Sequence, residues 1–599
     1  MSTQAESLLQ QYFGFPSFRH GQSQTIERVL AGQNTLCIMP TGGGKSVCYQ
    51  IPALIFEGTT IVISPLISLM KDQVDALAQM GILATYINSS LTLRETNERM
   101  RQVMAGKFKL LYVAPERLES PEFIAQLRLL TIPLVAIDEA HCISQWGHDF
   151  RPSYLNIQTF INNLEHRPIV LALTATATSG VRTHMCSLLN IGSNNTIMTT
   201  FARKNLSFQV LKGENNEQFL KDYLKKNHQD VGIIYAATRK NVDRLYTHLK
   251  RSGIAIAKYH AGLANEERAL YQEQFLHDQV DVIVATSAFG MGIDKSNVRF
   301  VIHYQLPKNM ESYYQEAGRA GRDGLDSECI LLYNSQDVQV QRYLIEQSTD
   351  QTRMTSELDK LQSMVDYCHT EGCLQTFILN YFGEATKESC HRCGNCTDTR
   401  ESVDVTLEAQ KVISCVIRLN QRFGKTMIAQ VLTGSNNKKV LEFGFDRLPT
   451  YGILPTQTIK EVNTFIEFLI SEAYLSVEQG AFPTIKITQK GKQVLLGDIL
   501  VKRKQKIETK QITKENPLFE ALRALRRQLA TEERVPPFVI FSDKTLQDIC
   551  NKFPQTRSDL LKVKGIGEQK KEKYGERLLM LIQQFSQEEE IENYLYKNS

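Results

Sequence analysis

A glycine-rich segment, PTGGGKS at residues 40–46, has the residue types and spacing of a phosphate-binding loop. It follows the apolar run TLCIM and precedes VCYQIPALIF, which can form a helix. Backbone N–H groups in a glycine turn can approach phosphate oxygens because no Cβ stands in the way. We expect Lys45 to reach the β- and γ-phosphates of a nucleotide and Ser46 to bind Mg²⁺. The residues predicted to contact the nucleotide are Thr41, Gly42, Gly43, Gly44, Lys45 and Ser46.

The residue just before this segment departs from the full phosphate-loop pattern. Met39 stands where that pattern has a glycine. The alternative interpretation is therefore a plain glycine turn between a strand and a helix, with no ligand.

Two adjacent carboxylates, Asp138 and Glu139, follow the apolar run PLVAI. In open α/β sheets ligands bind at the carboxyl ends of the strands, so these side chains are expected at the nucleotide. We expect Asp138 to hold Mg²⁺ and Glu139 to orient and deprotonate the attacking water. A lone DEA sequence is common on exposed surfaces, but its place after a buried strand makes it more specific here.

The segment QEAGRAGRDG at residues 315–324 supplies two further cations, Arg319 and Arg322. Their spacing of three allows both to face one side of a helical turn. An arginine delivered from a second lobe can stabilise charge on a transferring phosphate, which makes hydrolysis depend on lobe closure. Both arginines are candidates for this role, and a surface network of Arg and Asp is the alternative.

The only tryptophan, Trp146, lies in the stretch IDEAHCISQWGHDFRPSY at residues 137–154, in a chain with 27 phenylalanines and 22 tyrosines. Its neighbours are polar turn formers, and Pro152 prevents a helix from continuing. We therefore predict a polar loop that carries aromatic rings. Core filling is the alternative for a single tryptophan.

Short apolar runs recur through the first 335 residues, separated by helical patterns such as RKNVDRLYTHLKRSG. The runs are TLCIM, TTIVIS, KLLYVA, PLVAI, IVLAL, VGIIYA, DVIVAT, VRFVIHY and CILLY. The runs lack polar alternation, as is typical of strands buried on both faces of a parallel sheet. The stretch at 201–215 has no strong strand signal and divides the runs into two groups. We predict an α/β fold with two lobes, residues 1–207 and 208–337.

The remaining residues change in character along the chain. Residues 338–404 read as helical with clustered cysteines, and residues 405–500 as a small α+β domain. The charged stretch at 501–516 is predicted to be a linker, because it has few large apolar residues. Residues 517–590 are again helical, and residues 591–599 are predicted to be a tail.

Four cysteines in the third region, Cys373, Cys390, Cys393 and Cys396, have the spacing C-x16-C-x2-C-x2-C. This spacing predicts a structural zinc site closed by thiolates. Such an ion stabilises helices that lack a core of their own. His391 and the pair Cys368 and His369 are possible substitute ligands.

The composition limits the class of protein. A chain of 599 residues is too long for one core and predicts roughly three to five domains. No apolar run approaches the roughly 18 residues that span a bilayer, and the N-terminus lacks the pattern of a secretory signal. Twelve cysteines, mostly scattered, do not resemble a disulfide scaffold and favour a reducing cytoplasm. The net charge of +4 is too small to indicate nucleic-acid binding by itself.

Taken in order, these motifs resemble those of the RecQ family of superfamily 2 helicases. The matching segments are FGFPSFRHGQ, PTGGGKS, SPLISLMKDQ, YVAPERL, DEAHCISQWGHDFRP, LTATAT, GIIYAATR, ATSAFGMGIDK and QEAGRAGRDG. The resemblance spans nearly the whole chain. Loops of this superfamily often lack the first glycine, so Met39 is no defect.

The resemblance implies two RecA-like lobes with ATP in the cleft between them. It also implies that Arg19 and Gln22 contact adenine and that Phe15 packs on its ring. Residues 405–500 resemble the family's winged-helix domain, and residues 517–590 its helical HRDC module. In the HRDC module, lysines beside a Gly-Ile-Gly turn could approach a phosphate, and a solvated charged helix is the alternative.

The resemblance also gives the tryptophan a role. In this family the loop after the DEAH box lies where single-stranded DNA crosses the lobes. Trp146 and Phe150 would stack on bases, and His148 and Arg151 would meet phosphate or the lobe interface. Gly147 would keep the loop adjustable, so that the loop can report DNA occupancy to Glu139.

The implied activity is that of an ATP-dependent 3′→5′ DNA helicase in recombination, repair, the SOS response and replication-fork processing. The implied cofactors are ATP, Mg²⁺ and Zn²⁺. The implied partners are single-stranded and forked duplex DNA, with single-strand-binding protein as a candidate and no membrane. The expected location is the bacterial cytoplasm, in association with the nucleoid. The alternatives are a DEAH-type RNA helicase and a catalytically silent protein that binds DNA structures.

Overall fold

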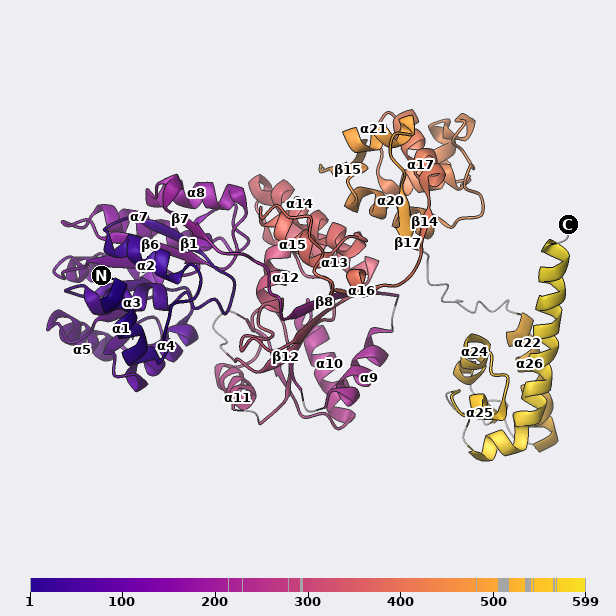
Figure 1. Ribbon diagram of the computed structural model, residues 1–599, viewed down its shortest axis with the longest axis horizontal. Helices are drawn as coiled ribbons and strands as arrows, with labels where there is room; N and C mark the ends of the chain where they lie inside the picture. Colours follow the sequence, from indigo (N-terminus) through magenta and orange to yellow (C-terminus); the bar gives the residue numbers. More distant parts are fainter. Residues whose placement is uncertain are drawn as a thin grey trace. The chain divides into compact units, whose positions relative to one another are not determined.

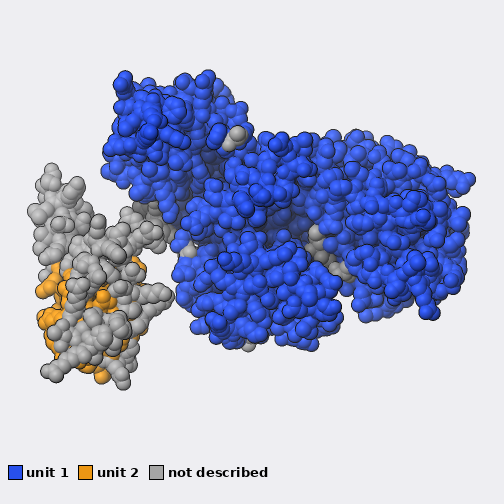
Figure 2. All heavy atoms as spheres, turned by 180° about the vertical axis from the view of Figure 1, so that it is seen from behind, with its two compact units in different colours: residues 1–504 blue, residues 505–599 orange. Residues whose placement is uncertain are grey.

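The computed structural model forms two compact units, residues 1–504 and residues 505–599 (Figure 2). It describes residues 2–213, 215–228, 230–277, 279–290, 295–480, 482–504, 517–533, 540–541, 543–563, 566 and 568–597. Part of the predicted linker, residues 505–516, lies outside the described residues, as do residues 291–294 and both glycines of the predicted Gly-Ile-Gly turn.

The first lobe is built on a parallel sheet with the strand order β3-β4-β2-β5-β6-β1-β7. Every residue of β1, β2, β4 and β5 is buried, as expected for apolar runs covered on both faces. The strands are β1 (Thr35–Ile38), β2 (Thr60–Ile63), β3 (Ala84–Ile87), β4 (Leu110–Val113), β5 (Leu134–Ile137), β6 (Ile169–Thr174) and β7 (Thr196–Met198).

Helices follow most of these strands and complete the first lobe (Figure 1). Local sequence sets their ends: α5 begins at a capping box in which Thr92 and Glu95 satisfy each other's backbone N–H groups. The helices are α1 (Ser2–Leu8), η1 (Leu9–Phe13), α2 (Gln22–Leu30), α3 (Val47–Ile55), α4 (Ile67–Gln79), α5 (Leu93–Met104), η2 (Pro115–Glu119), α6 (Pro121–Leu127), η3 (Ala140–Ile143), η4 (Pro152–Tyr154), α7 (Leu155–Asn162), α8 (Ser179–Leu189) and η5 (Ser193–Asn195).

The second lobe has its own parallel sheet, with the strand order β10-β11-β9-β12-β13-β8. The strands are β8 (Leu206–Lys212), β9 (Val231–Tyr235), β10 (Ile256–Tyr259), β11 (Val282–Ala285), β12 (Val298–His303) and β13 (Ser327–Tyr333). The helices are α9 (Asn216–Lys226), α10 (Arg239–Arg251), α11 (Asn265–Leu276) and α12 (Met310–Ala317). The predicted α/β class with two lobes is confirmed.

Strand β8 lies inside the stretch at 201–215 that shows no strong strand signal in the sequence. The sequence prediction was wrong here for a physical reason. Leu206 and Phe208 are buried, while Ser207 and Gln209, which alternate with them, are only half-buried. An edge strand of this kind alternates and forms no continuous apolar run.

A helical region follows β13 and shares one hydrophobic core with parts of both lobes. Its helices are α13 (Ser335–Ser348), α14 (Gln351–His369), α15 (Leu374–Tyr381) and α16 (Gly394–Thr397). In Figure 1, α14 and α15 lie beside α12 of the second lobe, and α16 packs on β8. The cysteine-rich region therefore packs directly on the second lobe.

The fourth region has a separate core formed by α17, α18, α20 and their neighbours. Its helices are α17 (Thr406–Arg418), α18 (Lys425–Leu432), α19 (Lys438–Glu442), η6 (Phe445–Arg447), α20 (Ile459–Ser471) and α21 (Gln489–Leu496). Strands β15 (Leu475–Glu478) and β16 (Thr484–Ile487) form an antiparallel hairpin. Strand β14 (Ser402–Asp404) pairs antiparallel with β17 (Lys502–Lys504), so the two ends of the region meet.

The second unit is helical around a core of its own. Its described helices are α22 (Pro517–Glu533), α24 (Asp543–Lys552), α25 (Arg557–Leu560) and α26 (Glu568–Lys597). Helix α26 continues through residues 591–597, which the sequence predicts to be a tail. Among the described residues, no helix combines the length and the apolar character needed to span a bilayer.

Candidate nucleotide, zinc and DNA sites

The phosphate loop connects β1 to α3, as the sequence predicts. Gly42 and Gly44 have φ angles of +81° and +79°, a region that favours glycine. A Cβ added at Gly43 would lie 2.9 Å from the carbonyl oxygen of Pro40. The backbone therefore requires glycines here. Lys45 Nζ donates a hydrogen bond to the carbonyl oxygen of Met39 at 3.3 Å, so the lysine lies along the loop.

Two side chains at the start of α2 contact the phosphate loop: Arg19, just before the helix, and Gln22, its first residue. Arg19 Nη1 donates to the carbonyl oxygen of Gly42 at 2.7 Å. Gln22 Nε2 donates to the carbonyl oxygen of Gly44 at 2.9 Å, and its Oε1 accepts from the backbone N–H of Arg19 at 2.8 Å. Phe15 is half exposed in the same segment. The structure thus brings Arg19 and Gln22 to the loop, and adenine contact by these residues stays a prediction.

Asp138 and Glu139 follow β5, at the carboxyl edge of the first sheet. Burial, followed by repulsion from Glu139, raises the pKa of Asp138 to about 7. Burial also raises the pKa of Glu139, and Lys45 and Arg319 oppose that rise. The two carboxylates therefore lie close together in a partly buried site.

Glu139 has two features that set it apart from an ordinary surface carboxylate. Its φ of +46° is uncommon for a non-glycine residue, and such backbone strain is concentrated at functional sites. Its Oε2 is buried with no hydrogen-bond partner among the described residues, although His141 Nδ1 lies 3.4 Å away. A buried carboxylate oxygen that lacks a donor fits a site completed by a cation and water.

The two predicted arginines lie in a turn after α12, and each comes close to a glycine of another segment. A Cβ added at Gly42 would lie 3.5 Å from Cγ of Arg322, so Arg322 rests on the phosphate loop. Arg319 is buried, and its Nη2 would lie 2.9 Å from a Cβ added at Gly290. Helix α12 ends at Ala317. The two arginines therefore lie in a turn that follows the helix, and their joint action on a phosphate stays a prediction.

Arg203, in the connection between the lobes, joins this arginine turn to the phosphate loop. Its Nη1 donates to the carbonyl oxygens of Thr41 at 2.9 Å and Gly318 at 3.3 Å. Its Nη2 donates to those of Ala320 at 3.1 Å and Gly321 at 3.0 Å. Sequence reasoning missed Arg203, because its partners are backbone carbonyls that no spacing pattern reveals.

The loop after the DEAH segment is a series of turns, as the sequence predicts. The side chain of Trp146 is 44% exposed, which argues against core filling. Arg151 Nη1 donates to the carbonyl oxygen of Pro65 at 3.1 Å, and its Nη2 lies 3.1 Å from Asp149 Oδ2. A Cβ at Gly147 would lie 2.4 Å from the carbonyl oxygen of His141. Close packing thus requires glycine at position 147. The sequence had suggested a different reason for this glycine, namely that it keeps the loop adjustable.

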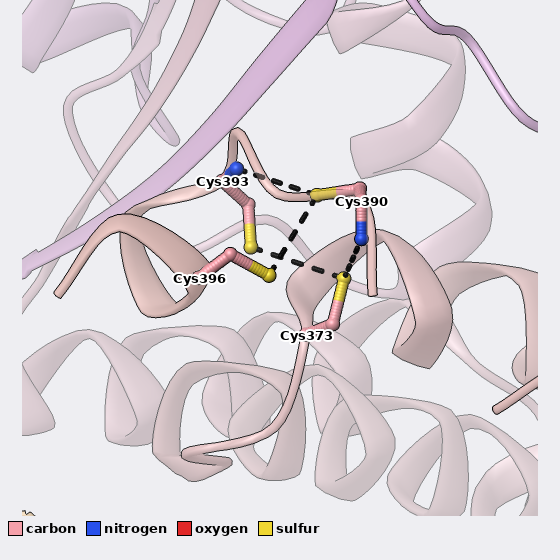
Figure 3. A group of neighbouring side chains, drawn as sticks. All are labelled: Cys373, Cys390, Cys393 and Cys396. Carbon is pink, nitrogen blue, oxygen red and sulfur yellow. Dashed lines mark hydrogen bonds between the residues drawn. The ribbon is translucent and has the colours of Figure 1, made fainter. Parts of the chain in front are cut away.

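Four sulfur atoms meet between α15 and α16 (Figure 3). The Sγ atoms of Cys373, Cys390, Cys393 and Cys396 all lie within 4.8 Å of one another. Cys390 and Cys396 are 4.0 Å apart, and Cys373 and Cys393 are 3.9 Å apart. A tetrahedral zinc with Zn–S bonds of about 2.3 Å separates its sulfurs by about 3.8 Å. The cluster therefore has the dimensions of a four-thiolate zinc site.

Backbone donors and neighbouring residues prepare these thiols for a metal. The backbone N–H of Leu374 donates to Cys393 Sγ at 3.4 Å, and that of Cys390 donates to Cys373 Sγ at 3.3 Å. Burial alone would raise the pKa of Cys373, but hydrogen bonds from Thr376 and Cys390 lower it to about 6. The proposed substitutes do not join the cluster: His391 is exposed, and His369 lies 3.0 Å from Glu467 instead.

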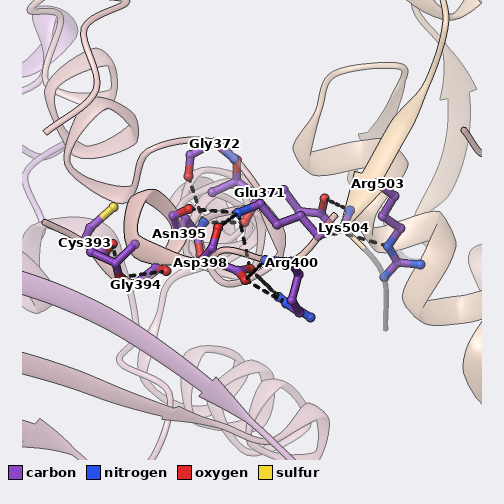
Figure 4. A network of polar contacts seen from close by, with 11 residues as sticks. Glu371, Gly372, Cys393, Gly394, Asn395, Asp398, Arg400, Arg503 and Lys504 are labelled. Atoms are coloured by element: carbon purple, nitrogen blue, oxygen red, sulfur yellow. Dashed lines mark hydrogen bonds and ion pairs between the residues drawn. The ribbon is translucent and has the colours of Figure 1, made fainter. Parts of the chain in front are cut away.

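A polar network connects the cysteine cluster to the end of the fourth region (Figure 4). Asn395 Nδ2, close to Cys393, donates to the carbonyl oxygen of Gly372 at 2.8 Å. Lys504 Nζ in turn donates to the carbonyl oxygen of Asn395 at 3.2 Å. The backbone N–H of Lys504 donates to Glu371 Oε2 at 2.6 Å. Residues next to the cysteine cluster therefore also contact β17, at the end of the fourth region.

Five family models match the chain, one after another. The DEAD/DEAH box helicase model matches residues 19–184, and the helicase conserved C-terminal domain matches residues 215–324. The RecQ zinc-binding model matches residues 335–397, the RQC domain residues 399–511 and the HRDC domain residues 515–582. These models follow the regions seen in the fold.

Known relatives are similar along nearly the whole chain. The ATP-dependent DNA helicase RecQ of Bacillus subtilis is 57% identical over 587 residues, which cover 98% of this chain and 99% of the relative. The chain belongs to the RecQ family. The RecQ protein of Pasteurella multocida is 40% identical, over 97% of this chain and 94% of that protein. A relative in Acanthamoeba polyphaga mimivirus, named a putative ATP-dependent RNA helicase, is 37% identical over 81% of this chain and 91% of its own.

Membership of the RecQ family confirms the resemblance read from the motifs. The order of regions is two RecA-like lobes, a zinc-binding region, an RQC winged helix and an HRDC domain. The zinc-binding family model and the four-cysteine cluster together support Zn²⁺ as a cofactor. The helicase family model and the RecQ relatives support ATP and Mg²⁺ as the other cofactors.

Proposed function

We propose that this chain is an ATP-dependent DNA helicase that moves in the 3′→5′ direction along a single strand. One observation carries the proposal: the phosphate loop meets the arginine turn through Arg203, and the loop that exposes Trp146 lines one cavity with Arg319 of that turn. A nucleotide site formed by two lobes can open and close, and an exposed ring beside it can bind a base. The relatives named as ATP-dependent DNA helicases support this assignment.

The phosphate loop is proposed to hold the nucleotide. The N–H groups of Gly42, Gly43 and Gly44 cradle phosphate oxygens, and Lys45 neutralises their charge. Thr41 completes this loop. Arg19 and Gln22 stand beside it for adenine, with the exposed ring of Phe15 nearby. Their existing contacts with the loop would couple base recognition to loop geometry.

Hydrolysis is proposed to use Glu139 as the base that accepts a proton from the attacking water. Burial raises its pKa, which brings a carboxylate closer to the range where it can accept a proton at neutral pH. Mg²⁺, held by Ser46 and Asp138, would neutralise phosphate charge. Arg319 and Arg322 supply further positive charge from the second lobe.

The loop that carries Trp146 and Phe150, called the aromatic loop below, is proposed to bind the translocating strand. Trp146 and Phe150 would stack on bases, and His148 and Arg151 would contact phosphate or the lobe interface. Stacking does not depend on base identity, which suits a motor that moves along any sequence. ATP binding closes the lobes and hydrolysis reopens them, so alternating contacts with the strand produce steps.

A strand-displacement assay on tailed duplexes tests the polarity. The protein should separate a duplex with a 3′ single-stranded tail when ATP and Mg²⁺ are present, and it should leave a 5′-tailed duplex paired. Efficient separation of the 5′-tailed substrate alone would contradict the proposed direction. A protein that binds both substrates but hydrolyses no ATP would be the silent DNA-binding alternative.

RNA unwinding is a second candidate, because one relative is named a putative RNA helicase. Stimulation of ATP hydrolysis by oligothymidine and by oligouridine of equal length distinguishes the two. We expect the DNA strand to stimulate the rate far more strongly. Equal or greater stimulation by RNA would favour the second candidate.

We also propose the cellular setting that accompanies this activity. The setting is the bacterial cytoplasm at the nucleoid, in recombination, repair and fork processing. Single-strand-binding protein is the proposed partner there, since it covers the strand on which the motor must load. The RecQ relatives from Bacillus and Pasteurella support a bacterial setting. Co-purification of single-strand-binding protein with the full chain, after nuclease treatment, tests the partner.

A further inference from the structure

Three cations surround one buried carboxylate on α14. Glu357 is 2% exposed, and its Oε1 lies 2.9 Å from Lys360 Nζ and 3.8 Å from Arg353 Nη2. Lys308 Nζ, from the loop between β12 and α12, lies 2.6 Å from Oε2. Burial alone would raise the pKa of Glu357, but Lys360 and Lys308 bring the pKa below its usual value. The carboxylate is therefore ionised, and it neutralises only part of the positive charge around it.

Two of these cations also hold the aromatic loop of the first lobe. Lys360 Nζ donates to the carbonyl oxygen of Trp146 at 2.9 Å. Arg353 Nη2 donates to the carbonyl oxygen of Gly147 at 3.2 Å, and its guanidinium lies 5.4 Å from the ring centre of Phe150. The cations thus lie next to the rings that are proposed to stack on bases.

We propose that Lys308, Arg353 and Lys360 form a phosphate-binding site for the strand that stacks on Trp146, and that Glu357 gathers these cations in the DNA-free protein. The inference rests on the proposed function, since it extends the DNA contact from the loop to α14. In a single strand each base has its own phosphate close by, so cations at the loop backbone are within reach of the stacked segment. None of the three cations belongs to the motifs read from the sequence.

A phosphate has a physical advantage over the present partners of Lys360 and Arg353. A phosphodiester oxygen carries much of a full negative charge, whereas a backbone carbonyl is only a dipole, and charge-assisted hydrogen bonds are the stronger ones. The strand should therefore take these donors from the carbonyl oxygens of Trp146 and Gly147. The loop is then free to rearrange, so phosphate binding on α14 and base stacking on the loop become coupled.

The salt dependence of binding tests the phosphate contacts directly. Affinity of the full chain for a short labelled oligothymidine is measured by fluorescence anisotropy at several salt concentrations. Arg353→Gln and Lys360→Gln should each lower the slope of log affinity against log salt by about 0.7, as expected for one lost contact on a single strand. Arg353→Lys keeps the charge and should restore the slope, which a purely structural role would not require.

Lys225→Gln is a matched control that removes one exposed positive charge elsewhere. Lys225 lies on α9, which Figure 1 draws well apart from α14. The slope of log affinity against log salt for Lys225→Gln should equal that of the unsubstituted protein. If Arg353→Gln and Lys360→Gln also match this control, the proposal is overturned.

Glu357→Gln tests the proposal in the opposite direction, because it removes a negative charge and should raise the affinity for DNA. Glutamine has nearly the same shape but no charge, so the site gains one net positive charge and should bind oligothymidine severalfold more tightly at low salt. Equal or weaker binding by the folded variant would contradict the proposal. A melting curve checks folding first, and if Glu357→Gln does not fold, the slopes of the arginine and lysine variants decide alone.

Trp146 supplies a second readout because it is the only tryptophan in the chain. Oligothymidine should change its fluorescence in the unsubstituted protein, and Lys360→Gln should shift that titration to higher DNA concentration. Failure of the phosphate site and failure of the proposed function are distinguishable. A protein that unwinds DNA while these variants behave like Lys225→Gln rejects only the phosphate site, whereas absence of DNA-stimulated ATP hydrolysis in the unsubstituted protein rejects the function.

Discussion

The imidazole rings of His141 and His148 stack face to face, with centroids 4.3 Å apart and planes inclined by 16°. His141 Nδ1 lies 2.9 Å from Thr174 Oγ1 and 3.4 Å from Glu139 Oε2. Burial lowers the pKa of His141 to about 4 and that of His148 to about 3, so both rings are neutral at pH 7. The stack therefore connects the loop that carries Trp146 to the carboxylate proposed as the base, without charge repulsion between the rings.

Trp146→Ala should separate DNA-stimulated from DNA-free ATP hydrolysis. The substitution removes a stacking surface of about 1–3 kcal/mol per base, so stimulation by oligothymidine and unwinding should collapse. The DNA-free rate and the melting temperature should change far less, because the ring is 44% exposed. Trp146→Phe, which keeps a ring, is the control and should retain most of the stimulation. An early melt together with loss of the DNA-free rate would instead indicate a role in the core.

Glu139→Gln should abolish turnover while ligands still bind. The amide keeps the shape of the carboxylate but cannot accept the proton from water, so the rate should fall by about 10² or more. ATP affinity and oligothymidine affinity, measured by titration, should persist. Near-normal hydrolysis by this variant would reject Glu139 as the base.

Arg203→Ala should slow hydrolysis with little change in the KM for ATP. Loss of the guanidinium frees the arginine turn from the phosphate loop, and a displacement of about 1 Å near a reacting group can cost roughly 10²-fold in rate. Arg203→Lys should recover only part of the rate, since one ammonium cannot reach all four carbonyl oxygens. Steady-state rates over a range of ATP concentrations separate the two parameters. A rise in KM alone would assign Arg203 to nucleotide binding.

Cys393→Ser should remove zinc and unfold the cysteine-rich region. The substitution replaces the Cys393 thiolate, which accepts a hydrogen bond from the backbone N–H of Leu374, by a serine hydroxyl. The tetrahedral site therefore loses one thiolate ligand. Zinc content measured by elemental analysis should fall, and duplex binding should weaken with it. Cys186→Ser, outside the cluster, is the control and should keep its zinc. A folded Cys393→Ser protein with full duplex affinity and no zinc would make the cluster incidental.

Burial of His369 should make the folded protein less stable as the pH falls from about 6.5 to about 4. Burial lowers the pKa of this imidazole to about 4 in the folded protein, whereas an unfolded histidine titrates at about 6.5. Because the folded pKa is depressed, the unfolded chain binds the extra proton as the pH falls through this window. Stability is therefore full above about pH 6.5 and falls by up to about 3 kcal/mol on the way to pH 4.

Melting temperatures at about pH 7.5 and about pH 5 measure this effect. The unsubstituted protein should lose more stability over the interval than His369→Gln, which has nothing to protonate. Glu467, which lies 3.0 Å from His369 Nε2, does not titrate in the same window. Burial would raise its pKa, but the hydrogen bond with His369 and the charges nearby lower it to about 2. Equal losses in both proteins would remove His369 as the cause.

The sequence predicted the strands in the middle of each sheet and missed those at the edges. Among the described residues of the two lobes, the four strands that no apolar run predicts, β3, β7, β8 and β10, are the end strands of the two sheets. An inner strand such as β5 is buried along its whole length and reads as a continuous apolar run. An edge strand such as β3 alternates between buried and half-buried residues, so its signal resembles that of a loop.

The sequence by itself determined those functional groups whose members lie close together along the chain. The glycine turn before Lys45, the carboxylates after β5 and the spacing of the four cysteines each lie within one short segment, where residue type and spacing carry the information. Only the tertiary structure decided which distant backbones these groups meet. Arg203 bridges Thr41 and Gly318, and Lys360 donates to a carbonyl 214 residues earlier in the chain. Every residue has a carbonyl group, so no side-chain pattern can name such a partner before the chain has folded.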